Sequence, residues 1–213
     1  MSMEHYKKIS TVFERATDGS KKLIPGKYID PTVEMCRDLM WDWTEKIDGT
    51  NICVHWDGYR VRFGGHDEGS SIPATLVNRL IELFGGETNE ELFEQKFGST
   101  PVTLYGEGYG TNIAKIGRQY KSDGVDFILF DVRVGSLWIR RDGVEDIARC
   151  FGIQAAPVVL RGTIDDAVTY VKSKPMSTIG TAPMEGVVGR LPEELHDRRG
   201  NRLIVKVKVR DFD

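Results

Sequence analysis

The sequence predicts an α+β fold in which antiparallel sheets are flanked by helices. Short runs of alternating apolar residues, joined by turns that contain glycine, recur along the chain. The segments with helical spacing do not alternate regularly with these runs, as a doubly wound parallel sheet would require. The 213 residues, 40% of them hydrophobic and 29% charged, are enough to bury a core without disulfide bonds. Because no repeat or linker divides the chain, we expect a single domain over residues 1–213.

Two hairpins are the clearest strand predictions. In the first, residues 51–63 alternate apolar and polar side chains and turn at Gly58. In the second, residues 127–139 form an apolar run that turns at Gly135. β-Branched and aromatic residues predict further strands at residues 102–105, 187–188 and 204–209.

Three segments have helical spacing. Apolar residues three and four positions apart predict a helix from Leu76 to Phe84. A second helix fits residues 144–151. A third begins at Thr163, because Asp166 stands at the position that completes a capping box.

Several classes of protein are disfavoured. The N-terminus lacks the apolar core of a secretory signal, and no apolar run is long enough to span a membrane, so we expect a cytoplasmic protein without membrane association. The three cysteines, Cys36, Cys53 and Cys150, are odd in number and widely separated, which favours reduced thiols over a disulfide framework. The net charge of −3 means that nucleic acid could bind only through a local basic patch.

A lysine stands immediately before the first hairpin, in the string Lys46-Ile47-Asp48-Gly49. Alone, this string is a weak signal, and its simplest interpretation is a turn. At a strand end beside a glycine, however, a lysine is a compact nucleophile that a phosphate can approach closely.

Two more lysines stand near the C-terminus. Lys206 and Lys208 alternate with valines, so in a strand both lysines point to one face with their backbones about 7 Å apart. That spacing suits a polyphosphate. The alternative is a half-exposed strand whose outer face is basic.

Three carboxylates lie at predicted strand edges: Glu107, Asp131 and Glu185. A glycine beside an acid would let a metal ion or a ribose approach the backbone. Taken singly, each of these acids, and Arg62 on the return strand of the first hairpin, is more simply an ordinary surface residue.

In chain order, these pieces resemble the six-motif signature of the covalent nucleotidyltransferases, the superfamily of ATP-dependent ligases and mRNA capping enzymes. The six matching strings are Lys46–Gly49, Arg62–Gly64, Tyr105–Glu107, Phe127–Asp131, Glu185–Val188 and Val205–Lys208. Glu45 before the lysine, Asn51 after the glycine and the Phe-x-x-Phe-Asp string are most similar to the RNA ligase 2-like family. The resemblance implies the ATP-grasp-like catalytic domain of ligases.

The resemblance also implies an ATP-dependent RNA ligase. Lys46 would attack the α-phosphate of ATP, expel pyrophosphate and become lysyl-AMP. The AMP would then pass to a 5′-phosphate RNA end and be displaced by a 3′-hydroxyl. Because an ordinary lysine is almost fully charged at pH 7, we expect the positive charges of Lys206, Lys208 and a divalent metal to favour the neutral amine, against the effect of Asp48 and Glu45.

The resemblance assigns the phosphate and metal sites to a few residues. Lys206 and Lys208 would act in catalysis with Lys46 by holding the phosphates. Glu185 would hold or position Mg²⁺ or Mn²⁺. Glu45 belongs to the nucleotide-binding set.

The base and ribose sites are assigned in the same way. Phe130 would stack on adenine, with Phe127 as the less favoured alternative. Glu107 and Arg62 would contact the ribose or the phosphate of the nucleic acid. Asn51 would bind nucleotide and act in the step that seals the ends.

Only residues 209–213 follow the last motif, so we expect a bare catalytic domain without an OB domain. This expectation disfavours a capping enzyme, but an ATP-dependent DNA ligase and a non-catalytic module that binds nucleic-acid ends stay as alternatives.

The expected partners are RNA 5′-phosphate and 3′-hydroxyl ends, with a nicked duplex as one candidate, and the protein is expected to be a monomer. The basic segment 198–202 is interpreted as a solvated hairpin tip, with contact to a phosphate backbone as the alternative.

Overall fold

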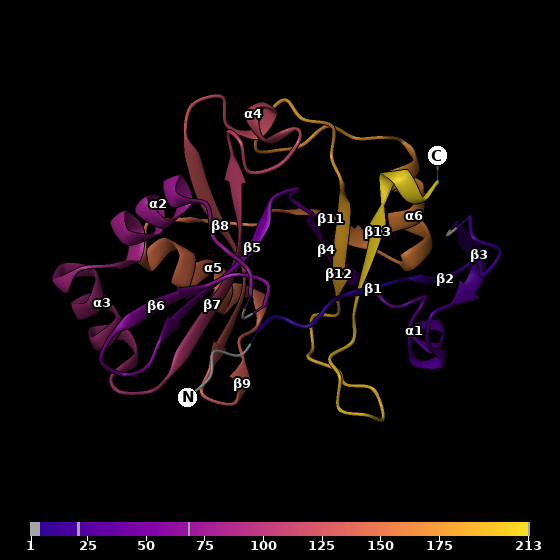
Figure 1. Ribbon diagram of the computed structural model, residues 1–213. Coiled ribbons are helices and arrows are strands. Elements are labelled where there is room, and N and C mark those ends of the chain that lie inside the picture. Colours follow the sequence, from indigo (N-terminus) through magenta and orange to yellow (C-terminus); the bar gives the residue numbers. More distant parts are fainter. Residues whose placement is uncertain (1–4, 21, 68, 213) are drawn as a thin grey trace. The chain divides into compact units, whose positions relative to one another are not determined.

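The computed structural model describes residues 5–20, 22–67 and 69–212 (Figure 1). The chain divides into two compact units: the first joins the N-terminal segment through Lys7 to Asp48–Ala156, and the second joins Lys8–Ile47 to Pro157–Asp213. Each unit has its own sheet and its own core. The expectation of a single domain over residues 1–213 stays a prediction.

A six-stranded sheet forms the first unit, in the order β10-β8-β7-β5-β6 with β9 on β8. Its strands are β5 (Thr50–Trp56), β6 (Val61–Gly64), β7 (Val102–Gly110), β8 (Val125–Val134), β9 (Leu137–Trp138) and β10 (Gln154–Ala155). Both predicted hairpins are present as β5–β6 and β8–β9. Every pairing is antiparallel except that of β10 with β8, which is parallel.

The helices of the first unit are α2 (Ala74–Phe84), α3 (Glu87–Phe97), α4 (Gly117–Tyr120) and α5 (Arg141–Cys150). Helices α2, α3 and α5 lie beside the sheet (Figure 1), and their apolar residues pack with those of the strands in one core. Leu76, Leu80 and Phe84 of α2 are fully buried there, as the helical spacing predicts. Because side chains alternate along a strand, the polar residues between the buried ones point to the opposite face, here called the open face of the first sheet.

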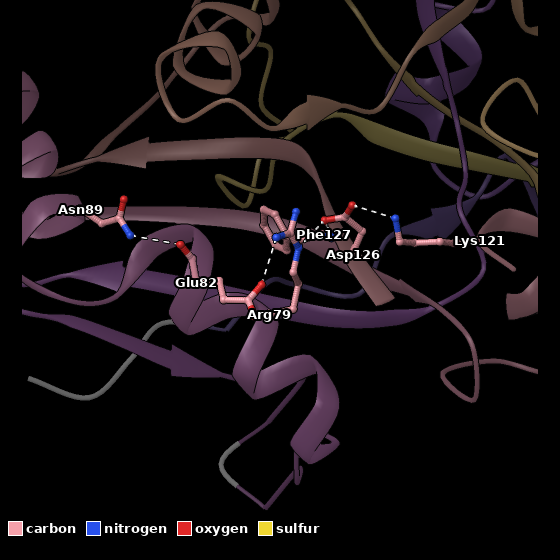
Figure 2. A network of polar contacts seen from close by, with 6 residues as sticks. All are labelled: Arg79, Glu82, Asn89, Lys121, Asp126 and Phe127. Atoms are coloured by element: carbon pink, nitrogen blue, oxygen red, sulfur yellow. Dashed lines mark hydrogen bonds and ion pairs between the residues drawn. The ribbon is translucent and has the colours of Figure 1, made fainter. Parts of the chain in front are cut away.

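A polar network ties α2 to the beginning of β8 (Figure 2). Asp126 accepts a hydrogen bond from Arg79 Nε at 3.1 Å, and Lys121 Nζ lies 3.6 Å from the same carboxylate. Arg79 also pairs with Glu82 at 3.1 Å, and Asn89 donates to the Glu82 carbonyl at 3.2 Å. These contacts hold the beginning of β8, the strand that contains Phe130, against α2.

A five-stranded sheet forms the second unit, in the order β1-β13-β12-β4-β11. The strands of this sheet are β1 (Ser10–Thr11), β4 (Trp41–Glu45), β11 (Val158–Gly162), β12 (Gly186–Arg190) and β13 (Ile204–Lys208). A separate pair of strands is formed by β2 (Phe13–Arg15) and β3 (Leu23–Tyr28). The helices of the second unit are α1 (Pro31–Met35), α6 (Ile164–Lys172) and the 3₁₀-helix η1 (Val209–Asp211). The β1–β13 pairing is parallel. The predicted final strand ends one residue early, because Val209 begins η1.

The core of the second unit lies between the sheet and α6. Trp41 and Trp43 of β4 are fully buried and stack with their rings 5.7 Å apart. Residues of α6 and the valines of β12 and β13 complete this core. The predicted capping box of α6 is confirmed, since Thr163 and Asp166 exchange both expected hydrogen bonds.

Two general expectations can be compared with the structure. Cys36, Cys53 and Cys150 are all free thiols. Across residues 5–20, 22–67 and 69–212, no helix has both the length and the apolar character needed to cross a bilayer.

Candidate functional site

Three neighbouring strands of the second unit bring together three of the expected site residues. Lys46 directly follows β4, and its backbone N–H donates to the Gly186 carbonyl at 2.9 Å. Gly186 begins β12 and lies opposite Lys208 of β13. The backbone of Glu185, one residue before β12, accepts a hydrogen bond from Val209 N at 2.9 Å. The backbone ladder therefore aligns Lys46, Glu185 and Lys208 side by side.

Their side chains form two ion pairs on one carboxylate. Lys46 Nζ lies 2.7 Å from Glu185 Oε2, and Lys208 Nζ lies 2.5 Å from Glu185 Oε1. The side chains are only 23%, 15% and 11% exposed for Lys46, Glu185 and Lys208. Burial by itself raises the pKa of Glu185, but the charges of the two lysines outweigh it and lower this pKa below its ordinary value. The carboxylate is therefore ionised at neutral pH.

Lys206 lies on the same face of β13 as Lys208, while Val205 and Val207 are buried in the core on the other face. This arrangement confirms the predicted alternation. Burial, the largest cause, and the positive charges of Lys208, Lys46 and Lys8 together lower the pKa of Lys206 to about 8, although Glu185 acts in the opposite direction. We call Lys46, Lys206, Lys208 and Glu185 the lysine cluster. It holds three amines and one carboxylate, an excess of positive charge that suits a polyphosphate.

Glu45 lies in the same unit but is not part of the lysine cluster. Its side chain is 2% exposed, and Oε2 accepts hydrogen bonds from the Thr178 backbone N–H at 2.9 Å and the Thr178 hydroxyl at 2.6 Å. The other oxygen, Oε1, is buried and makes no hydrogen bond with any described residue. Glu45 thus fixes the chain that leads to Glu185, and its nucleotide contact stays a prediction.

The open face of the first sheet carries three other expected residues, Asn51, Glu107 and Arg62. Asn51 of β5 and Glu107 of β7 lie directly opposite each other in the ladder. Asn51 Oδ1 is buried and makes no hydrogen bond within the described residues. Arg62 of β6 lies opposite His55, about 13 Å along the sheet from Asn51, and pairs with Asp57 at 2.8 Å. The structure therefore brings Asn51 and Glu107 together but leaves Arg62 apart from them.

Phe130 occupies a β-bulge in β8. Tyr105 pairs with Asp131 and Gly106 pairs with Leu129, so Phe130 is the extra residue between them. Phe130 is half-buried, whereas Phe127 is fully buried and meets Phe84 edge-on in the core. Of the two candidate stacking residues, only Phe130 has exposed surface to offer to a base.

The glycines beside the acids have a different role from the one expected. A Cβ on Gly186 would lie 2.1 Å from the Val207 carbonyl oxygen, and one on Gly106 would lie 2.2 Å from the Phe127 ring. A Cβ on Gly49 would lie 2.2 Å from the Gly108 carbonyl oxygen. These glycines permit close packing between elements of the protein rather than the approach of a ligand.

Sequence reasoning missed two residues that support the expected site. Thr178 holds Glu45, and Tyr6 contacts both Phe130 and Asp131. Neither residue lies in a motif or in a periodic segment, so the sequence carried no signal that could have identified it.

A family model described as RNA ligase matches residues 41–208, which contain all six motifs. The chain belongs to the RNA ligase family. The family that the motifs predict is thereby confirmed. No curated protein matches the chain.

Solved RNA ligase structures from Naegleria gruberi share this fold. An apo variant is 15% identical with a TM-score of 0.65, covering 93% of this chain and 55% of that one. The enzyme with pyrophosphate is 17% identical with a TM-score of 0.62, covering 95% and 61%. A variant with AMP and Mn is 16% identical with a TM-score of 0.63, covering 94% and 60%. Identities this low show the fold alone, which confirms the predicted α+β class, and the chain spans somewhat over half the length of these proteins.

Proposed function

We propose that this chain is an ATP-dependent RNA ligase whose Lys46 becomes covalently bonded to AMP. The observation that carries the proposal is the lysine cluster, in which Lys46, at a strand end, pairs with the same Glu185 carboxylate as Lys208. The RNA ligase family match includes every residue of this cluster. The names of the similar Naegleria structures include ATP and pyrophosphate, the substrate and the leaving group of such a step, and AMP, the group that it would transfer.

In the proposed first step, the lone pair of Lys46 Nζ attacks the α-phosphorus of ATP. A nitrogen–phosphorus bond forms, the bond from the α-phosphorus to the bridging oxygen breaks, and pyrophosphate leaves with that electron pair. The nitrogen releases the ammonium proton to water before the attack and a second proton to water as the bond forms. Attack also requires Lys46 to leave its ion pair with Glu185, which the arrival of phosphates on Lys206 and Lys208 would favour by competing for the amines.

Lys206 and Lys208 are proposed to hold the β- and γ-phosphates and to offset the charge that develops on pyrophosphate. Lys206 is well suited to respond to a ligand, since its pKa of about 8 leaves part of its population neutral near pH 8 and above, and a bound phosphate would favour the charged form. We therefore expect ATP binding near and above pH 8 to take up protons.

A divalent cation, Mg²⁺ or Mn²⁺, is the proposed cofactor, and Mn occurs in the names of the similar structures. It would neutralise charge on the phosphates. In the present arrangement both oxygens of Glu185 accept from lysines, so a metal held directly by Glu185 would have to replace an ammonium. The residues as arranged therefore do not fit direct coordination, and we assign no step to the metal.

The later steps are proposed from the family. AMP would pass from Lys46 to the 5′-phosphate of an RNA end, and a 3′-hydroxyl would displace it. Asn51 and Glu107, adjacent on the open face of the first sheet, are proposed to contact nucleotide or RNA. Action on a nicked duplex, as a monomer and in the cytoplasm, is part of the same proposal.

The test uses the full chain with ATP labelled at the α-phosphate, followed by denaturation. Label is expected on wild-type protein and on Lys27→Ala, a control at a lysine that is 59% exposed in the same unit, but not on Lys46→Ala. A panel of nicked duplexes with ribose or deoxyribose at the 3′ end then separates RNA from DNA ligation. Sealing that ignores the 3′-terminal sugar would favour the DNA ligase alternative, and absence of label on wild-type protein would favour the end-binding module.

A further inference from the structure

Tyr6 lies in the N-terminal segment of the first unit, outside any helix or strand, yet it is only 8% exposed. Its ring meets Phe130 edge-on at 5.0 Å between centroids. It also contacts Tyr105 at 5.1 Å and Trp138 at 5.9 Å. A residue from one end of the chain is thus inserted among aromatic side chains of the open face of the first sheet.

A hydrogen bond fixes the direction of this ring. The Tyr6 hydroxyl donates to Asp131 Oδ2 at 2.6 Å, and the Asp131 side chain is completely buried. The other oxygen of Asp131 accepts from the backbone N–H of Val132 at 3.1 Å. Because a buried carboxylate is costly without donors, Tyr6 is bound firmly to the residue that follows Phe130. His5, one residue earlier, contacts the Gly65 carbonyl at 3.1 Å and holds the segment in place.

Phe130 lies in a bulge, where the register of β8 against β7 shifts and the direction of a side chain differs from that at a regular strand position. The contacts of Tyr6 with Phe130 and Asp131 hold the ring at this irregular position. A ring that stacks on a base loses affinity if it must first be ordered. The edge-on contact with Tyr6 supplies that order before a ligand arrives.

We propose that Tyr6 is a positioning residue for nucleobase binding, which orients the Phe130 ring so that the base of ATP can stack on it. The inference rests on the proposed function, since it concerns the same nucleotide. It assigns to the N-terminal segment a role in base affinity that is separate from the phosphate contacts of the lysine cluster.

The experiment measures the rate of Lys46 labelling against ATP concentration in the full-length chain. Tyr6→Ala is expected to raise the KM for ATP about tenfold and to leave the rate at saturating ATP close to wild type, because base stacking contributes on the order of this factor. Inhibition by inorganic tripolyphosphate, which has no base, is expected to be unchanged. Tyr59→Ala, at a tyrosine 81% exposed in the same unit, is the matched control and is expected to behave as wild type.

Two further variants separate orientation from general stability. Tyr6→Phe keeps the ring but not the hydroxyl, so it should restore the KM for ATP to within about twofold of wild type while lowering the melting temperature, because Asp131 loses a donor. Tyr6→Leu fills the site without an aromatic ring, should keep the chain folded if Tyr6→Ala does not, and should raise the KM as Tyr6→Ala does.

Three results would overturn the inference: an unchanged KM in folded Tyr6→Ala or Tyr6→Leu, equal weakening of ATP and tripolyphosphate, or a KM in Tyr6→Phe as high as in Tyr6→Leu. Failure of the wild-type chain to take up label would instead overturn the proposed function. The two failures are therefore distinguishable.

Discussion

Replacing Lys206 with methionine is expected to stabilise the protein at neutral pH while weakening its interaction with ATP. Burial, followed by repulsion from Lys208, Lys46 and Lys8, lowers the pKa of Lys206 from an ordinary 10.5 to about 8. The difference of 10.5 − 8 = 2.5 pKa units corresponds to about 3 kcal/mol against the charged form. Because Lys206 is only half-buried, solvent screening reduces this to about 1–2 kcal/mol. Methionine keeps a similar volume without the charge.

The lowered pKa of Lys206 determines how the free energy of unfolding changes with pH. Below pH 8 Lys206 is charged in both the folded and the unfolded chain, so the folded state is destabilised by the full unfavourable energy of this buried charge. Between pH 8 and 10.5 the unfolded chain binds more protons than the folded one, so the stability contributed by wild-type Lys206 rises with pH. Urea unfolding of both proteins at pH 7 and pH 9.5 is the assay. We expect Lys206→Met to be more stable at pH 7 by about 1–2 kcal/mol and this advantage to shrink at pH 9.5. A variant that is less stable at pH 7, or an advantage that grows with pH, would refute the reasoning.

Three more substitutions test the packing and charge of the second unit. Gly189→Ala should lower the free energy of unfolding by about 2 kcal/mol, because its Cβ would lie 2.4 Å from the buried Trp43 ring, and an unchanged urea midpoint would contradict this. Thr163→Ala should cost about 1 kcal/mol by removing the N-cap of α6, and a loss below a few tenths would count against the capping box. Glu185→Gln leaves two amines facing a neutral amide, so it should cost about 3 kcal/mol and abolish labelling by ATP; full labelling of this variant would remove Glu185 from the site.

The parts of the fold that follow from local sequence were predictable. The hairpins β5–β6 and β8–β9 each have alternating side chains and a turn at a glycine with positive φ, Gly58 or Gly135. The capping box of α6 needs only Thr163 and Asp166, three residues apart. In each case the interacting groups are close in the sequence, so spacing alone contains the information.

The parts that depend on distant contacts were not predictable. The parallel pairing of β1 with β13 joins the two ends of the chain, and Thr178 meets Glu45 across 133 positions. Tyr6 and Asp131 are 125 positions apart. The bulge at Phe130 depends on the register of two long strands, which neither strand specifies alone.

The expected site was predictable to the extent that its residues lie in motifs. The alternation of Lys206 and Lys208 followed from the period of a strand, and Lys46 from its position before a hairpin. The ion pairs of Lys46 and Lys208 with Glu185 depend on the strand order β4-β12-β13. This order could not be predicted from the sequence, because the three strands are not consecutive along the chain. The glycines were assigned to ligand approach because sequence shows a missing side chain but not what lies against it.

The central claim is that the amine of Lys46 becomes bonded to AMP. The most direct measurement is peptide mass spectrometry of the full-length chain after incubation with ATP and Mg²⁺, compared with Lys46→Arg. The account predicts one added adenylyl group on the wild-type peptide that contains Lys46, and none on the arginine variant. An adenylyl group on another residue, or none at all on a folded wild-type chain, would contradict it.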